Sequence, residues 1–252
     1  MSKPSGNPVA LITGGGGGIG RAAALAFAQA GYGVAIADID ADAAQASADL
    51  LKAAQFDAFA LTVDIGDSTA VQAMLQQVRE RYGRLDAAFN NAGASSLRTP
   101  LADVDEDDWE RVMCTNVSGT FLCMKYQIRW MLEQGGGCIV NNCSVFGMGG
   151  GISATYTASK HAIAGLTRSA AISYAKQGVR INAVCPGLID AGMGARFKER
   201  GAEDISAVLA LHPAGRIGTA EEVAQAAVWL CSEHAQYIHG HLLPVDGGYS
   251  AR

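Results

Sequence analysis

Short apolar runs alternate along this chain with longer amphipathic stretches, and no other feature restricts the fold as strongly. The first apolar run covers 9–13, a helical pattern follows over 21–30, and a second apolar run lies at 34–37. Continuous apolar runs of this length are typical of parallel strands that are buried on both faces of a sheet. Because strand and helix patterns alternate throughout, the sequence predicts an α/β, doubly wound (Rossmann) domain with a parallel sheet of about seven strands.

The alternation continues to the end of the chain. Further strands are expected at 58–63, 85–89, 138–142, 180–184 and 241–245, and further helices at 41–54, 69–81, 107–134, 155–176 and 221–231. No linker, repeat or low-complexity tract divides the chain, so residues 1–252 are expected to form a single domain. The segment 187–212 has the least regular pattern, with four glycines among charged residues, and is expected to form a mobile substrate lid.

The composition indicates a globular, acidic protein. Charged residues make up 17% and apolar residues 49% of the 252 residues, unlike a disordered chain. The formal net charge of -5 argues against nucleic acid and an anionic membrane as main partners. No apolar run reaches the roughly 18 residues of a membrane span, and Met1–Pro8 lacks a signal-peptide core, so a cytoplasmic protein is expected. The six cysteines lack metal-ligand spacing and are expected to be free thiols, with no metal site.

A run of glycines lies where the first strand meets the first helix, in Thr13-Gly14-Gly15-Gly16-Gly17-Gly18-Ile19-Gly20. Five consecutive glycines match many patterns by chance, and the run could be a flexible loop. At a strand-to-helix turn, however, glycines let a pyrophosphate approach the backbone, and the helix N-terminus offers free N–H groups and partial positive charge. Gly14, Gly18, Ile19 and Gly20 are therefore expected to bind a dinucleotide.

Acidic and amide side chains follow the next three strands. Asp38 ends the second strand, 18 residues beyond Gly20, where a carboxylate can accept both ribose hydroxyls of an adenosine. It could instead cap the helix that follows Ile39. Asp64 ends the third strand, and the amide-rich segment 90–93 ends the fourth. Doubly wound sheets bind ligands at the carboxyl ends of their strands, although both segments could also be plain turn or cap signals.

Tyr156 and Lys160 are four residues apart, and Ser144 lies 12 residues before Tyr156. On a helix the tyrosine and the lysine share a face, so the ammonium can stand beside the phenol. A nearby positive charge favours the ionised form of a phenol. Such a tyrosine can take a proton from an alcohol or return one to a carbonyl oxygen, and Ser144 could hold that oxygen. The pair alone is weak evidence, because most such pairs are merely surface neighbours.

In this order, the motifs resemble those of the short-chain dehydrogenase/reductase family over nearly the whole chain, from Val9 to Gly248. The shared elements are the Thr-Gly-x-x-x-Gly-x-Gly turn at 13–20, Asp64, Asn90-Asn91-Ala92-Gly93, Asn116, Ser144, Tyr156, Lys160, Pro186-Gly187 and the terminal Val245-Asp246-Gly247-Gly248. The resemblance implies an oxidoreductase that transfers a hydride between a nicotinamide cofactor and a small-molecule alcohol or ketone.

The resemblance also implies a role for each matching residue. Tyr156 would be the general acid/base, Lys160 would favour its ionised form and hold the nicotinamide ribose, and Ser144 would bind the substrate oxygen. Asn116 would kink the long helix and place a water that relays protons from Lys160, although from the sequence alone it could be a buried polar group of a helix. The remaining implied cofactor-binding residues are Asp64 at the adenine, Asn90 at the adenosine-side ribose, Ile189 at the carboxamide through its backbone, and Ile65, Ala92, Gly93, Pro186 and Gly187.

Two departures from the family pattern lie near the substrate and the carboxamide. The interval from Ser144 to Tyr156 is one residue shorter than the family commonly shows, and three glycines at 149–151 fill it, so a tight, unobstructed loop is expected beside the substrate. Ala191 stands where many members carry a threonine bonded to the carboxamide, which puts one cofactor contact in doubt.

The sequence favours NAD over NADP and an apolar substrate. Asp38 would repel a 2′-phosphate, and the family's usual basic positions hold Gly17 and Ile39. No cationic cluster marks a carboxylate or phosphate site, so a medium-sized, apolar secondary alcohol or ketone is expected, with cyclic ones among the candidates. The candidate pocket residues, any of which could equally be core or lid packing, are Leu97, Phe146, Met148, Ile152, Leu188, Met193 and Phe197.

Other functions remain open from the sequence. Within the family, the chain could be a sugar or hydroxysteroid dehydrogenase. A cofactor-binding regulator without turnover would keep the same glycine turn, and so would a methyltransferase, which has no need of Ser144, Tyr156 and Lys160. The stretches 107–134 and 155–176 carry apolar residues on more than one face. One sheet cannot cover all of these faces. A homo-oligomer, most simply a homotetramer, is therefore expected, and the family resemblance points the same way.

Overall fold

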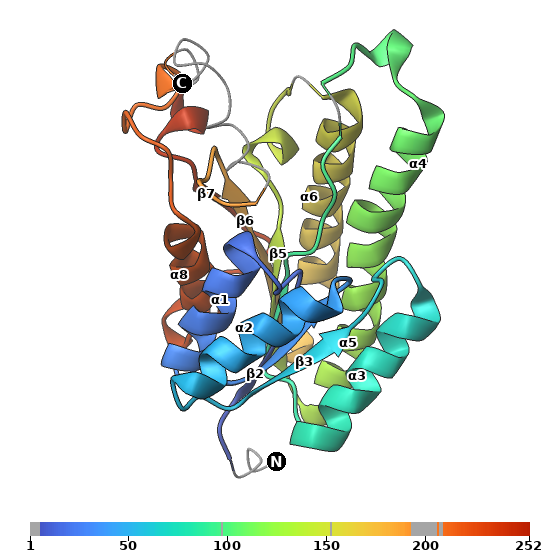
Figure 1. The fold of residues 1–252 in the computed structure, drawn as a ribbon, viewed down its shortest axis with the longest axis vertical. Helices are drawn as coiled ribbons and strands as arrows, with labels where there is room; N and C mark the ends of the chain where they lie inside the picture. Colours follow the sequence, from blue (N-terminus) through green and yellow to red (C-terminus); the bar gives the residue numbers. More distant parts are fainter. Residues whose placement is uncertain (1–5, 97, 152, 193–205, 207–208) are drawn as a thin grey trace.

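A parallel sheet forms the centre of the molecule. The structure, a computed structural model, describes residues 6–96, 98–151, 153–192, 206 and 209–252. Across these residues seven strands form one sheet in the order β3-β2-β1-β4-β5-β6-β7, and every neighbouring pair is parallel. The strands are β1 Val9–Thr13, β2 Gly33–Asp38, β3 Ala58–Thr62, β4 Ala87–Asn90, β5 Gly137–Asn142, β6 Val179–Pro186 and β7 Leu242–Val245. The chain winds outward in both directions from β1 and β4 (Figure 1), which confirms the predicted doubly wound fold.

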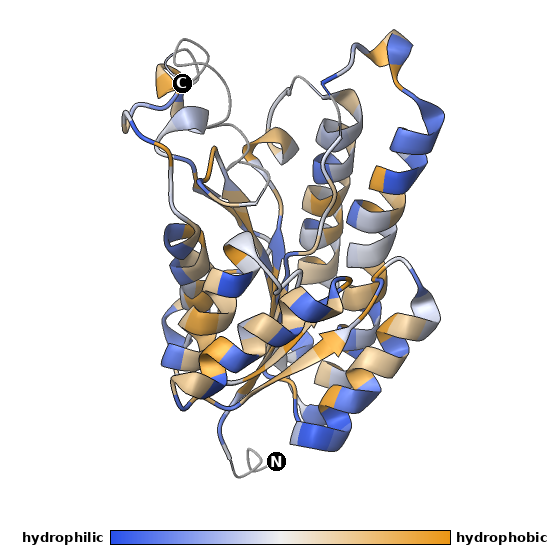
Figure 2. Cartoon of the chain, viewed as in Figure 1, coloured by the Kyte–Doolittle hydropathy of each residue, from blue (hydrophilic) through white to orange (hydrophobic). Residues whose placement is uncertain are grey.

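Helices cover both faces of this sheet. The helices α1 (Gly18–Gln29), α2 (Ala41–Ala53) and α8 (Ala220–Cys231) cover one face, and α3 (Ser68–Tyr82), α5 (Thr120–Gln134) and α6 (Ala154–Tyr174) cover the other, with α4 (Glu106–Met113) packed on α6. Successive residues of one strand serve opposite cores: Ile12 packs in the core under α1 and α8, and Leu11 in the core under α3 and α5. Both faces of each central strand are therefore apolar, and hydrophobic colour gathers on the strands and the helix faces turned to them (Figure 2).

The expected helix over 107–134 is interrupted in the structure. Helix α4 ends at Met113, six residues from Cys114 to Gly119 form a π-helical turn, and α5 then continues to Gln134. Gly119 lies in this turn against Ile65, and a Cβ there would come within 2.7 Å of the Ile65 side chain. A π turn widens a helix locally and is frequent at functional sites. The apolar periodicity did not reveal this break.

The expected lid at 187–212 lies largely outside the described residues. The structure does not describe residues 193–205 and 207–208, so the lid remains a prediction. Near the start of the segment, Ile189 forms a parallel bridge with Gly218, which lies six residues beyond its end. Within the described ranges, none of the helices has the length and apolar character needed to cross a membrane.

Candidate active site

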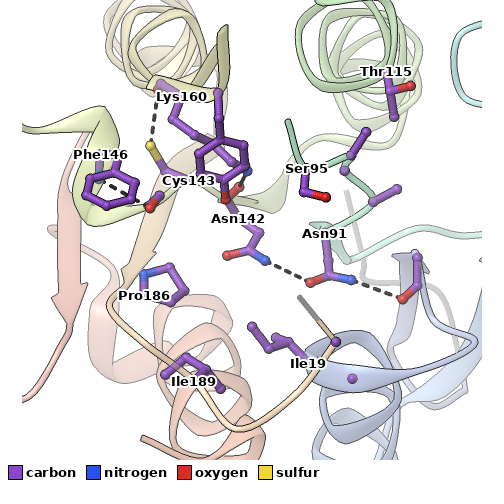
Figure 3. A pocket seen from close by; sticks show the side chains of 18 of the residues that line it. Ile19, Asn91, Ser95, Thr115, Asn142, Cys143, Phe146, Lys160, Pro186 and Ile189 are labelled. Atoms are coloured by element: carbon purple, nitrogen blue, oxygen red, sulfur yellow. Dashed lines mark hydrogen bonds between the residues drawn. The ribbon is translucent and has the colours of Figure 1, made fainter. Parts of the chain in front are cut away.

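A cavity of about 1440 Å³ opens along the carboxyl ends of the strands. Its walls include the ends of β2, β4, β5 and β6, together with the loops that follow them (Figure 3). Small-molecule sites usually occupy about 300–1,000 Å³, so this cavity has room for a dinucleotide beside a substrate. It brings together these predicted residues: Gly14, Gly18, Ile19, Asp38, Asp64, Ile65, Ala92, Gly93, Ser144, Tyr156, Lys160, Pro186, Gly187 and Ile189. The remaining predicted residues, Gly20, Asn90 and Asn116, are described by the structure but do not line the cavity.

The glycine run forms the turn from β1 into α1. Gly17 is the extended N-cap of α1 and supplies no side-chain cap, so the first N–H groups of the helix are left for a ligand at the cavity. Gly14 approaches the end of β4 so closely that a Cβ on it would lie 2.8 Å from the Cα of Ala92. Gly20 packs the helix against this turn, since its Cβ would lie 1.9 Å from the Gly14 carbonyl oxygen. The turn therefore fits a pyrophosphate group, and Gly20 serves the packing behind it.

Asp38 joins the end of β2 to the glycine turn. Its Oδ2 accepts the N–H of Gly16 at 2.8 Å, and its Oδ1 accepts the N–H of Asp40 at 3.1 Å. Asp40 is the residue that caps α2, through the N–H of Ala43 at 3.0 Å. The cap role that remained open for Asp38 is thus taken by Asp40, and Asp38 lies on the cavity wall.

A second contact holds the same turn from behind. Arg21 donates from Nε to the Ser47 hydroxyl at 2.9 Å and from its guanidinium to the carbonyl of Gly16. The Ser47 hydroxyl donates to this carbonyl as well, at 3.2 Å. The N–H and the carbonyl of Gly16 are therefore both held by side chains, and these bonds fix the turn beside Asp38.

Tyr156 and Lys160 lie on α6, one turn apart, at the other end of the cavity. The Lys160 ammonium donates to the carbonyl oxygen of Asn142 at 2.8 Å and lies 5.3 Å from the centroid of the Tyr156 ring. Lys160 is only 3% exposed, so its charge is little screened by water. Ser144 accepts the N–H of Phe146 at 3.2 Å, which leaves its own O–H to donate into the cavity. This arrangement can hold an oxygen and exchange a proton with it.

Asn116 lies in the π-helical turn and is fully buried. Its Oδ1 accepts the N–H of Ala94 at 2.7 Å, and its Nδ2 donates to the Ala94 carbonyl at 3.0 Å and to the Ser159 hydroxyl at 3.0 Å. Ser159 in turn donates to the carbonyl of Tyr156 at 2.7 Å. The side chain of Asn116 therefore ties the segment after β4 to α6, and its own helix departs from α geometry at this residue.

Asn90 belongs to a buried amide network below the cavity. It exchanges hydrogen bonds with Gln127 of α5, at 2.8 and 3.0 Å, and donates to Asn141 of β5 at 3.0 Å. Asn141 donates to Thr167 of α6 at 2.9 Å. The side chain expected at the adenosine-side ribose thus links β4 and β5 to the two helices beneath. The sequence signal for this network was an asparagine near the end of each of two apolar strands, Asn90 in β4 and Asn141 in β5.

Asn91 and Asn142 bridge the cavity floor. The sequence reasoning named Asn91 within the motif at 90–93 without giving it a role, and it missed Asn142. Asn142 donates from Nδ2 to Asn91 Oδ1 at 2.8 Å, and Asn91 donates to the carbonyls of Thr13 and Gly14 at 3.1 and 3.0 Å (Figure 3). The Oδ1 of Asn142 is buried and has no hydrogen-bond partner among the described residues. A buried acceptor without a partner at this floor fits a site that a polar ligand completes.

The substrate end of the cavity holds some of the predicted apolar residues. Phe146 and Leu188 line it, whereas Met148 packs in the core with Cys143 and Ile163. Four other candidates, Leu97, Ile152, Met193 and Phe197, lie outside the described residues. Further lining residues to which the sequence assigned no role include Ser95, Ser96, Thr115, Ser153, Leu211, His212 and Tyr249.

Two arginines also line the cavity, although no cationic cluster was expected there. These are Arg98 and Arg111. Arg111 pairs with Asp108 at 2.6 Å and donates to the carbonyl of Ser95 at 2.7 Å. Arg111 therefore already has an anionic partner at the cavity rim.

All six cysteines are free, and five of them are buried. The thiol of Cys143 donates to the Lys160 carbonyl at 3.2 Å. A hydrogen bond with Cys185 on the neighbouring strand lowers the pKa of Cys143 to about 7, against the effect of burial. The same hydrogen bond, together with burial, raises the pKa of Cys185. The Cys143 thiol thus contacts the backbone of α6 at Lys160.

Comparison with known proteins places the chain among dehydrogenases and reductases. A family model described as enoyl-(acyl carrier protein) reductase matches residues 15–250. The chain is 42% identical to 2,5-dichloro-2,5-cyclohexadiene-1,4-diol dehydrogenase of Sphingobium indicum over 82% of its length and 84% of that protein's. It is 38% identical to cyclohexanol dehydrogenase of an Acinetobacter species, over 100% of its length and 98% of that protein's. The crystal structure of levodione reductase superposes with a TM-score of 0.93 at 35% identity, covering 97% of this chain and 98% of that one. The chain is an oxidoreductase that belongs to the short-chain dehydrogenase/reductase family.

Proposed function

We propose that this protein interconverts a secondary alcohol and a ketone with NAD, using Tyr156 as the general acid/base. The observation that carries the proposal is the position of the buried Lys160 ammonium, 5.3 Å from the Tyr156 ring, in a cavity that Ser144 also lines. The opposite end of the same cavity holds the glycine turn and Asp38. One cavity thus offers a dinucleotide site and a proton-exchanging site.

The residues at the catalytic end divide the chemistry between them. A bound nicotinamide cofactor would accept or supply the hydride. Ser144 donates its hydroxyl hydrogen to the substrate oxygen, and Tyr156 takes the proton of the alcohol or returns it to the ketone oxygen. Lys160, held by the Asn142 carbonyl at 2.8 Å, keeps a positive charge beside the phenol and favours the phenolate.

Asp38 supports the choice of NAD. A carboxylate at the end of β2 can accept the two hydroxyls of an adenosine ribose and repels a 2′-phosphate. Gly17 and Ile39, the neighbouring positions where a basic residue would bind that phosphate, carry no charge. At the other end, the bridge to Gly218 uses the Leu188 carbonyl and the Asp190 N–H, and the Ile189 carbonyl accepts the N–H of Ala191 at 2.8 Å. The N–H of Ile189 takes no part in these bonds, which supports its proposed contact with a carboxamide.

The proposed substrate is a medium-sized, apolar, cyclic alcohol or its ketone. Phe146 and Leu188 supply apolar surface at the substrate end of the cavity. Several relatives carry names that refer to six-membered rings, among them a cyclohexadienediol dehydrogenase and a cyclohexanol dehydrogenase. Both names refer to an alcohol on a six-membered ring, which supports the same substrate class for this chain.

The proposed assembly is a homotetramer. Phe121 on α5 is 46% exposed and Ile172 on α6 is 83% exposed, so both helices carry large apolar side chains on their outer surface. Such side chains on two adjacent helices are readily buried against the same helices of a second copy.

A substrate screen tests the proposed function. The purified protein is mixed with NAD at pH about 9, because oxidation of an alcohol by NAD releases a proton, and with a panel of cyclic and acyclic secondary alcohols. NADH absorbance is followed. Formation of NADH with cyclic alcohols, lost in Tyr156→Phe, is the expected result. Binding of NADH without turnover of any alcohol or ketone would instead indicate a regulator.

A further inference from the structure

Aromatic rings from four parts of the chain form a continuous wall at the substrate end of the cavity. The Phe146 ring lies edge-on to the Tyr156 ring, with centroids 6.5 Å apart at 89°, and edge-on to the Tyr249 ring, also 6.5 Å apart, at 82°. His212 lies against Tyr249 with a centroid distance of 5.2 Å. All four residues line the cavity. Edge-to-face contacts are a favourable geometry for aromatic pairs, so the wall is one packed unit that begins at the catalytic phenol.

Gly151 gives Phe146 the space for this position. A Cβ on Gly151 would lie 2.8 Å from Cγ of Phe146 and 2.5 Å from Oγ1 of Thr157. The same atom on Gly149 or Gly150 would meet nothing within 4 Å. Only Gly151 among these three glycines therefore places the ring.

The C-terminal turn fixes Tyr249 on the other side of Phe146. Oδ1 of Asp246 accepts the N–H of Gly248 at 3.0 Å, and Oδ2 accepts the N–H of Ser250 at 2.8 Å and its hydroxyl at 2.5 Å. Gly248 lies against Pro213, whose Cγ would be 3.1 Å from a Cβ on the glycine. Tyr249 is thus held between two anchored neighbours, with its ring directed to the cavity.

We propose that Phe146, placed over Gly151 and braced by Tyr249, is the residue that selects cyclic substrates. Its exposed hydrocarbon face would pack against the ring of a cyclic alcohol and bring the alcohol carbon to Tyr156. A short acyclic alcohol buries less apolar surface on this wall and gains less from it. This inference rests on the proposed function, namely proton exchange between an alcohol and Tyr156.

Three variants and one matched control test the wall. Phe146→Ala removes the ring, Tyr249→Leu removes its brace, and Gly151→Ala displaces it, whereas Gly149→Ala adds the same methyl group in open space. The measured quantity is the ratio of kcat/KM for cyclohexanol to that for 2-propanol. This ratio is expected to fall about tenfold or more in Phe146→Ala and to fall in the same direction in the other two variants. It should stay at the wild-type value in Gly149→Ala.

Calorimetry of cyclohexanone binding to the NAD complex gives a second measurement that needs no turnover, because NAD carries no hydride to transfer to a ketone. Weaker binding of cyclohexanone by Phe146→Ala and Gly151→Ala, at an unchanged affinity for NAD, supports the proposal. Equal binding by wild type and Phe146→Ala, with NAD still bound, overturns it. A different result would overturn the proposed function: a wild type that binds cyclohexanone but oxidises neither cyclohexanol nor 2-propanol. If Phe146→Ala does not fold, Gly151→Ala and Tyr249→Leu test the proposal through the same ratio of kcat/KM for cyclohexanol to that for 2-propanol.

Discussion

Oδ2 of Asp38 lies 2.8 Å from the backbone nitrogen of Gly16, whose N–H it accepts. The bond joins the end of β2 to the glycine turn that precedes α1. It holds the carboxylate at the adenosine end of the cavity, while Asp40, two residues further, caps α2. The two carboxylates therefore have separate tasks, and substitutions can separate them.

The wild type is expected to use NAD at least about tenfold better than NADP by kcat/KM, a difference of about 1.4 kcal/mol. Asp38→Ser with Ile39→Arg should shift the preference toward NADP, because the repulsion is removed and a guanidinium can pair with the phosphate. Ile39 is 69% exposed, so the arginine has room. Steady-state rates with both cofactors measure the change.

Asp40→Ser is the control for this experiment, because serine keeps a capping oxygen and removes only the neighbouring charge. Its preference for NAD should equal that of the wild type. A wild type that uses NADPH as well as NADH would show that Asp38 is not the ribose ligand.

Tyr156→Phe should lower kcat by about 10²- to 10⁴-fold, the usual contribution of a general acid/base, and should leave NADH binding largely intact. The ring and its edge-on contact with Phe146 remain, so the loss reports on the hydroxyl alone. Tyr174→Phe, near the C-terminal end of the same helix, should keep wild-type activity. Stopped-flow rates and NADH fluorescence titrations measure the two effects. Near-normal turnover in Tyr156→Phe would exclude the proposed mechanism.

Lys160→Ala should weaken cofactor binding as well as turnover. The lysine lies between the Asn142 carbonyl and the Tyr156 ring, at the position proposed for the nicotinamide ribose. A fluorescence titration with NADH is expected to show a higher dissociation constant than in Tyr156→Phe. Equal affinities in the two variants would mean that Lys160 acts on the phenol alone.

The sequence predicted the sheet, and the position of Tyr156 and Lys160 on one helix, for a physical reason. Strands such as β1 are apolar on both faces, and Tyr156 and Lys160 are related by the period of one helix, so both signals are local. The break at 114–119 has no local signal, because Asn116 contacts Ala94 and Ser159, which are distant in sequence, and only the family resemblance led us to expect a kink there. Tyr249 was missed for the same reason, since its contact with Phe146 joins residues 103 positions apart.

Asn116→Ala should destabilise the protein as well as reduce activity. It leaves the N–H and carbonyl of Ala94 without their partner, and each unsatisfied buried group costs about 1–3 kcal/mol. Urea unfolding is expected to show a free energy of unfolding lower by about 2 kcal/mol or more. Gln76→Ala, an exposed substitution on α3, should stay within about 0.5 kcal/mol of the wild type. A similarly small effect for Asn116→Ala would show that the amide is dispensable for the fold.

Light scattering at micromolar concentration should give a homo-oligomer, with a tetramer as the proposed state. Phe121→Asp or Ile172→Asp places a charge on the exposed apolar surface of α5 or α6 and should lower the assembly state. A stable wild-type monomer would contradict the proposal.

Gly20→Ala should destabilise the protein even though alanine is the better helix former. A Cβ at position 20 would lie 1.9 Å from the Gly14 carbonyl oxygen and 2.7 Å from Nδ2 of Asn91, so α1 must move away from the glycine turn. Overpacking of this kind typically costs about 1–3 kcal/mol, against the roughly 1 kcal/mol that alanine gains in a helix. Gly17→Ala adds the same methyl group at an extended N-cap with nothing within 4 Å, and its unfolding free energy should match that of the wild type. Urea unfolding of both variants, followed by NADH titration, separates stability from binding. If Gly20→Ala unfolds at the same urea concentration as Gly17→Ala, the close packing of α1 on the glycine turn does not require a glycine at position 20.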